Sequence, residues 1–137
     1  MDDLTQARKL LQEQGYTCVL CRDGQHYTSR HRGVRPLMDL LEKDLSGFSA
    51  ADKVVGKATA LLYCLLKIRR LYAQVISDAA LEVLQAHGID VVWDRQVPHI
   101  SNREGTGWCP MEMATQDISD PALAPEAIRN KLKQLQG

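Results

Sequence analysis

The segment from residue 54 to residue 66 is the most apolar part of the chain, and it limits what the chain can fold into. Its only charged side chain is Lys57, so no continuous polar face is available to turn toward water. We predict one helix from about Ala50 to Lys67, with the Ser49 hydroxyl capping its first turn. Because this helix is apolar on nearly every side, we expect it to be the buried helix of the fold.

Strands and helices alternate after this segment. Leu71–Ile76 is a nearly continuous apolar run, typical of a buried strand. Ser77 and Asp78 can cap a following helix that ends near Gly88, and residues 90–97 form a further strand. Since a helix separates the two strands, we expect them to be parallel neighbours joined by a crossover connection.

The first thirty residues predict a helix and a β-hairpin. Apolar residues recur at helical spacing over residues 1–14, and Gly15 lies just past the end of that helix. Two β-rich runs, 16–22 and 25–29, flank the tight-turn pair Asp23-Gly24. This pattern is typical of a β-hairpin.

The carboxyl-terminal part of the chain predicts a long loop over 98–108, a short helix from Pro110, and an amphipathic helix over 121–136. We therefore predict one domain over residues 1–137, of class α/β. Its expected architecture is a three-layer α/β/α sandwich around a mixed sheet of about four strands that starts with a β-hairpin.

Charge and hydropathy exclude several classes of partner. Seventeen basic and seventeen acidic side chains give a net charge of zero, without the basic excess typical of nucleic-acid binders. The apolar run from Ala58 to Leu66 is far shorter than the roughly 20 residues of a membrane span. The acidic, polar start of the chain is unlike a secretory signal. We expect a cytoplasmic protein that binds neither nucleic acid nor membrane.

The cysteines do not predict a metal site. Cys18 and Cys21 have the spacing of half a zinc knuckle, but residues three apart on a strand point to opposite faces. Cys64 and Cys109 are isolated, and the histidines are scattered. We expect reduced thiols, no metal and no cofactor.

Charged residues at the start of the predicted buried helix form the first candidate site. On a helix, Lys53 and Lys57 would share a face, with Asp52 beside them and Gly56 allowing close approach to the backbone. One interpretation is a polar cluster at the mouth of a site. The other is a solvated helix end with Asp52 near the positive end of the dipole.

The loop that follows the second parallel strand is the second candidate site, since ligands bind at the carboxyl ends of such strands. Its glycines let backbone amides approach a ligand, and Arg103 can bind a carboxylate or phosphate. Cys109 would be the N-cap of the helix from Pro110, where a thiol becomes a better nucleophile, or it is a plain cap. The candidate catalytic residues are Cys109, Asp52 and Lys53, and the candidate ligand-binding residues are Lys57, Ser77, Asn102, Arg103, Gly105, Thr106, Gly107 and Glu112.

The two candidate segments, Gly47–Ala58 and Asn102–Glu112, together resemble a small prokaryotic family of uncharacterised proteins that carry a domain of unknown function. The likeness extends from about Tyr16 to Gln116. That family is a divergent branch of the cytidine deaminase-like fold, so the resemblance implies a three-layer α/β/α fold.

The resemblance also indicates whether the chain has the zinc ligands of deaminases. Deaminases of that fold carry a His/Cys-Ala-Glu triplet at the start of the buried helix and Pro-Cys-x-x-Cys at the start of the next helix. Here the corresponding places hold Ala51-Asp52-Lys53 and Ser77–Ala80, which supply no zinc ligands and no general acid/base glutamate. The resemblance implies a pocket without zinc, lined by Asp52, Lys53 and Ser77 or Asp78.

Three hypotheses for function follow. We favour a pocket that binds a small anionic or nucleotide-like metabolite in a regulatory or interaction module. The alternative is a zinc-independent enzyme in which Cys109 is the nucleophile, Asp52 or Glu112 moves protons, and Lys53 or Lys57 binds the anionic group. A redox sensor through Cys109 is a third hypothesis. A homo-oligomer stays open, since the terminal helices can cover the sheet or contact a second subunit.

Overall fold

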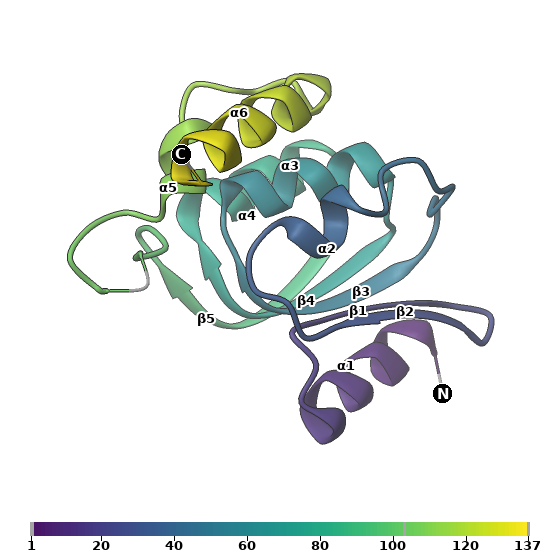
Figure 1. Cartoon of the computed structure of the whole chain (residues 1–137). Coiled ribbons are helices and arrows are strands. Elements are labelled where there is room, and N and C mark those ends of the chain that lie inside the picture. The colour runs from purple at the N-terminus through teal and green to yellow at the C-terminus, as the bar shows by residue number, and fades with distance from the viewer. Residues whose placement is uncertain (1, 103, 137) are drawn as a thin grey trace.

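A mixed sheet of five strands is formed by the residues that the computed structural model describes, 2–102 and 104–136 (Figure 1). Its strand order is β2-β1-β3-β4-β5. The strands are β1 (Cys18–Arg22), β2 (Gln25–Ser29), β3 (Ser49–Val55), β4 (Arg70–Ser77) and β5 (Asp90–Val97). The class α/β is as predicted, but the sheet has one strand more than the sequence indicated.

Helices cover both faces of the sheet unequally (Figure 1). Helix α1 packs on one face against β1 and β3, and the other helices lie on the opposite side, where α5 and α6 pack against α3. The helices are α1 (Asp3–Gln14), α2 (Arg35–Met38), α3 (Lys57–Leu66), α4 (Asp78–Ala86), α5 (Pro110–Ala114) and α6 (Ala124–Gln136), with a 3₁₀ turn at Pro121–Leu123. Within the described ranges, no helix combines the length and the apolar character that crossing a membrane requires.

The predicted hairpin is confirmed. Strands β1 and β2 pair antiparallel, and the turn between them places Asp23 at φ 49° and Gly24 at φ 83°. Positive φ at both turn residues matches the right-handed twist of the flanking strands, which is why Asp-Gly favours this turn.

A strand, not the first turns of a helix, occupies residues 49–55. Strand β3 pairs antiparallel with β1 and parallel with β4, so Ser49 begins a strand and caps no helix. The predicted helix over 50–67 is wrong in its first part, because α3 begins only at Lys57. Lys53 and Lys57 therefore lie on different elements and share no helix face. The first four residues of β3 are all buried, and a strand covered on both faces loses the alternation that would distinguish it from a buried helix.

The parallel pair is confirmed. Strands β4 and β5 pair parallel, with Leu71 opposite Val91, and α4 connects them. The N-cap of α4 is Ser77, whose Oγ accepts a hydrogen bond from the amide of Ala80. The helix begins where the sequence predicted it, because a capping hydroxyl satisfies one of the free amides of the first turn.

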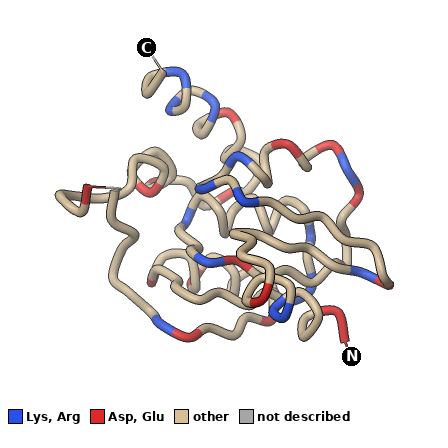
Figure 2. Tube along the Cα trace, turned by 60° about the horizontal axis from the view of Figure 1, so that its bottom comes forward, with Lys and Arg blue, Asp and Glu red and all other residues tan. Residues whose placement is uncertain are grey.

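The core has two parts, one on each face of the sheet. Cys18 and Leu20 belong to the larger part, around α3, whereas Val19 and Cys21 belong to the smaller part, under α1. This confirms that Cys18 and Cys21 point to opposite faces of β1. Lysines and arginines are spread along the trace together with the acidic residues, in keeping with a net charge of zero (Figure 2).

Truncation of a core side chain on α3 should show how strongly this helix holds the fold. Leu61 is fully buried, so we expect Leu61→Ala to lower the free energy of unfolding by about 2–5 kcal/mol. The matched control is Leu123→Ala, whose side chain is 58% exposed and should change stability by less than about 0.5 kcal/mol. Urea denaturation of both variants checks this, and equal losses would contradict the assigned core.

Candidate functional site

A cavity of about 720 Å³ lies where β3 ends and α3 begins. Its walls come from the end of β3, the start of α3, the segment at residues 30–35 that follows β2, the loop after β5, helices α5 and α6, and Thr17 just before β1. Segment 30–35 follows one edge strand of the sheet, and the loop follows the other edge strand. The cavity is therefore enclosed by connections that leave the sheet at its two edges.

The cavity brings together four of the residues that the sequence singled out. Its lining includes Lys53, Asn102, Cys109 and Glu112. The remaining candidates in the described part of the chain do not line it; they are Asp52, Lys57, Ser77, Gly105, Thr106 and Gly107. Arg103 lies outside the described residues.

Glu112 closes the amino end of α3. The N-cap residue, Gly56, has no side chain to accept from the free amides, and the amide of Lys57 donates instead to Glu112 Oε1 at 3.2 Å. Only 4% of Glu112 is exposed. A Cβ atom on Gly56 would lie 2.6 Å from the same oxygen, so the carboxylate can approach only because residue 56 is glycine. A carboxylate here also benefits from the positive end of the helix dipole.

Cys109 occupies the predicted N-cap position of α5, with Pro110 as the first helical residue. Its side chain makes no capping hydrogen bond, and the thiol is partly buried on the cavity wall. The Cys109 amide donates to the carbonyl of Ile100 at 2.8 Å, which ties the start of α5 to the loop after β5. This contact fixes the position of the thiol but does not test its proposed reactivity.

Asn102 organises the loop in which the predicted glycines lie. Its Oδ1 accepts from the amide of Thr106 at 3.0 Å, and its amide nitrogen donates to Thr106 Oγ1 at 3.2 Å. The backbone amide of Asn102 donates to the carbonyl of Gly107, and Gly105 has φ 72°, which favours glycine. Thr106 and the two glycines thus shape the loop, and Asn102 alone of these four residues lines the cavity.

Lys57 and Ser77 are engaged elsewhere. The ammonium group of Lys57 donates to the carbonyl of Gln116 at 2.8 Å, just past the end of α5. Ser77 is fully buried and caps α4, and Asp78 accepts from the side chain of Gln96. Across residues 2–102 and 104–136, no three His, Cys, Asp or Glu side chains gather closely enough to hold a metal ion.

Asp52 lies in the core, beside the cavity but not in its wall. Tyr63 Oη donates to Asp52 Oδ2 at 2.7 Å, and Cys18 Sγ lies 3.3 Å from the same hydroxyl. The Val54 amide approaches Asp52 Oδ1 at 3.4 Å. Burial raises the pKa of Asp52 to about 7, although hydrogen bonds from Tyr63 and the backbone act in the opposite direction.

Sequence reasoning missed three arginines. The cavity wall includes Arg30, Arg32 and Arg35, which with Lys53 we call the basic rim. The Arg30 guanidinium donates to the carbonyl of Gln14 at 3.0 Å and lies over the ring of Tyr16. Among the residues described, no carboxylate lies within 4 Å of a basic-rim side chain. The sequence feature that could have revealed them is the presence of three arginines within the six residues 30–35.

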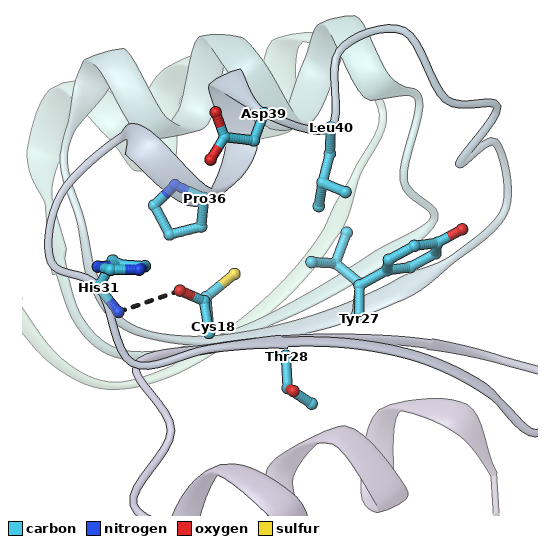
Figure 3. A pocket seen from close by; sticks show the side chains of 9 residues that line it. Cys18, Tyr27, Thr28, His31, Pro36, Asp39 and Leu40 are labelled. Atoms are coloured by element: carbon cyan, nitrogen blue, oxygen red, sulfur yellow. Dashed lines mark hydrogen bonds between the residues drawn. The ribbon is translucent and has the colours of Figure 1, made fainter.

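A smaller cavity of about 230 Å³ lies over the β-hairpin (Figure 3). Cys18 and Tyr27 face it from the sheet, and Pro36 and Leu40 face it from α2 and the residues after it. His31 lies at one end, where its backbone amide donates to Ser29 Oγ at 3.0 Å. Its wall is mainly apolar and contains none of the predicted site residues, so the larger cavity is the better candidate site.

Because the pKa of Asp52 is raised, this residue should make stability depend on pH. The folded state holds the proton to about pH 7, whereas the unfolded chain releases it near pH 4, so the stabilisation is complete below pH 4 and is lost as the pH rises to 7. At about 1.4 kcal/mol per pKa unit, the loss reaches up to roughly 4 kcal/mol. Urea denaturation from pH 4 to pH 8 measures it.

Asp52→Asn should remove most of this slope and be more stable than the wild type at pH 8, since the amide oxygen still accepts from Tyr63. The matched control is Asp90→Asn, at an exposed position, which should leave the slope unchanged. A wild-type slope that survives in Asp52→Asn would show that Asp52 is not its source.

Comparison with known proteins identifies the family. The family model described as TM1506, a domain of unknown function (DUF1893), matches residues 6–132. The crystal structure of a DUF1893 family protein (TM1506) from Thermotoga maritima is similar, with a TM-score of 0.86 and 24% sequence identity over 94% of this chain and 89% of that chain. At this identity the likeness establishes a shared fold. No curated protein matches the sequence. Because the family model spans nearly the whole chain, the chain belongs to the DUF1893 family of unknown function.

Proposed function

We propose that the protein binds a small anionic, nucleotide-like metabolite in the cavity at the start of α3. The observation that carries this proposal is the basic rim, a group of four cationic side chains around one cavity in a chain with no net charge. Among the described residues that line the cavity, Glu112 is the acidic one, and its Oε1 already accepts from the amide of Lys57. The wall therefore has an excess of positive charge that an anionic ligand would neutralise.

The size and place of the cavity support the same proposal. A volume of about 720 Å³ falls in the range of cavities that enclose small metabolites. Strands β3, β4 and β5 run parallel, and the cavity lies at the carboxyl end of β3, beside the loop after β5. Ligands of open α/β sheets bind at this end of the strands, where loops and helix starts supply polar groups.

The proposal includes a relation to the cytidine deaminase-like fold without its zinc chemistry. The buried helix begins at Gly56-Lys57-Ala58, not at Ala51-Asp52-Lys53, which lies in β3. Neither triplet contains the His or Cys ligand and the Glu that such deaminases place there, and the start of α4 lacks cysteine. A deaminase-like ancestor that lost its metal ligands but kept its pocket accounts for this pattern.

A zinc-independent enzyme is the second candidate function. The observation in its favour is that Cys109 and Glu112 line the same cavity, the first at the N-cap of α5 and the second on that helix. A thiol nucleophile and a carboxylate that moves protons are the groups such chemistry needs. In this version the basic rim holds the anionic part of the substrate.

Loss of one basic-rim side chain should weaken binding. We expect Arg32→Ala to raise the Kd for nucleoside monophosphates at least tenfold, since a charge-assisted hydrogen bond is lost. The matched control is Arg95→Ala, which removes an exposed arginine on β5 outside the cavity. Isothermal titration calorimetry at low salt measures both variants. No binding by the wild type, or equal Kd values for the two variants, would refute the proposed function.

Bound ligand should protect Cys109 from alkylation. Both Cys109 and Cys64 are partly buried thiols, but only Cys109 lines the cavity. Saturating nucleotide should slow the reaction of Cys109 with iodoacetamide at least fivefold and leave the reaction of Cys64 unchanged. Peptide mass spectrometry follows both rates in one sample, so that Cys64 serves as the internal control. Equal rates with and without nucleotide, despite binding, would place the ligand elsewhere.

A further inference from the structure

One side of the cavity carries arginines and the other carries a carboxylate. This difference affects which anion the cavity can bind. The inference rests on the proposed function. Arg32 and Arg35 reach the cavity from the segment that follows β2, whereas Glu112 reaches it from α5, beyond β5. One side supplies hydrogen-bond donors with positive charge, and the other supplies an acceptor with negative charge.

One backbone amide at the amino end of α3 already has an acceptor. Helix starts commonly bind phosphate through free backbone amides, but here the Lys57 amide donates to Glu112 Oε1. A phosphate at this end would lie against a carboxylate and be repelled. The anionic part of a ligand is therefore directed away from α3 and toward the basic rim.

Glu112 retains capacity to accept a hydrogen bond. A carboxylate has about four lone-pair sites, and one hydrogen bond, from Lys57, is present in the described part of the chain. Among the described residues Oε2 has no hydrogen-bond partner and is not a fully buried unpaired atom, so it keeps some exposure, and Glu112 lines the cavity. A group that contacts Glu112 must donate.

We infer that the ligand is a phosphomonoester with hydroxyl or amino donors at its other end, as in a sugar phosphate or a nucleotide. Its phosphate binds the basic rim, and a donor hydrogen-bonds to Glu112. A ligand with only the anionic group lacks the second contact, and a ligand with anions at both ends is repelled by Glu112. The cavity thus selects for a polar, two-ended molecule and fixes its orientation.

Two matched probes test this inference in the wild-type protein, before any variant is made. Methyl phosphate carries the phosphate alone, and ribose 5-phosphate carries the phosphate and hydroxyls. We expect ribose 5-phosphate to bind at least tenfold more tightly, because a hydrogen bond to a charged group contributes on that order. Equal Kd values would overturn the inference while leaving anion binding intact. No binding of either probe would also overturn the inference, whereas the titration with nucleoside monophosphates tests the proposed function separately.

Glu112→Gln then assigns the preference to one side chain. Glutamine keeps an oxygen that can accept from Lys57, so the α3 start retains its cap, but the negative charge is lost. The variant should lose at least fivefold in affinity for ribose 5-phosphate and bind methyl phosphate equally or more tightly. Arg32→Ala should instead weaken both probes. A Glu112→Gln variant that weakens both equally would mean that Glu112 only supports the fold, and would overturn the inference.

Discussion

Strand β3 joins the two halves of the sheet, and the rest of the structure depends on it. Its hydrogen bonds to β1 run antiparallel, and those to β4 run parallel. Without it, the hairpin β1–β2 and the parallel pair β4–β5 would be separate pieces, each with an unpaired edge. Its faces are covered by α1 on one side and α3 on the other, so a single short strand organises all three layers.

The position of β3 also determines where a cavity can form. The strand ends at Val55, and after one residue, Gly56, the chain turns into α3. The absence of a side chain at this turn lets α5 bring its carboxylate to the helix start, and α5 in turn holds the loop after β5. Backbone geometry and one carboxylate thereby set the wall of the cavity on the β5 side.

Elements with a clear hydrophobic period or a clear turn were predicted correctly from the sequence. Prediction failed where burial on both faces removed the alternation of apolar and polar residues. The hairpin had its Asp-Gly turn, and α4 had a capping serine, so both were found. Strand β3 was read as helix because its first four residues are buried on both faces, which leaves no alternation. Because of that single error, Asp52 and Lys53 were predicted on a helix instead of a strand, and the expected number of strands was one too low.

Only part of the candidate site was predicted, because some of its residues come from a distant segment of the chain. Cys109 and Glu112 were placed by local signals, namely a proline at the helix start and the loop before it. The arginines at 30–35 come from a connection far away in the sequence, and only the strand order β2-β1-β3 brings that connection to the start of α3. Contacts between distant segments follow from tertiary packing, which a local pattern does not encode.

Arg30 shows how the helix on the far face of the sheet contributes to the cavity. Its guanidinium donates to Gln14, the last residue of α1, and stacks over Tyr16. An arginine loses on the order of 1 kcal/mol of side-chain entropy when a ligand immobilises it, and here much of that loss is incurred when the protein folds. Helix α1 thus preorganises one cation of the site, so the integrity of the outer layer enters directly into the free energy of ligand binding.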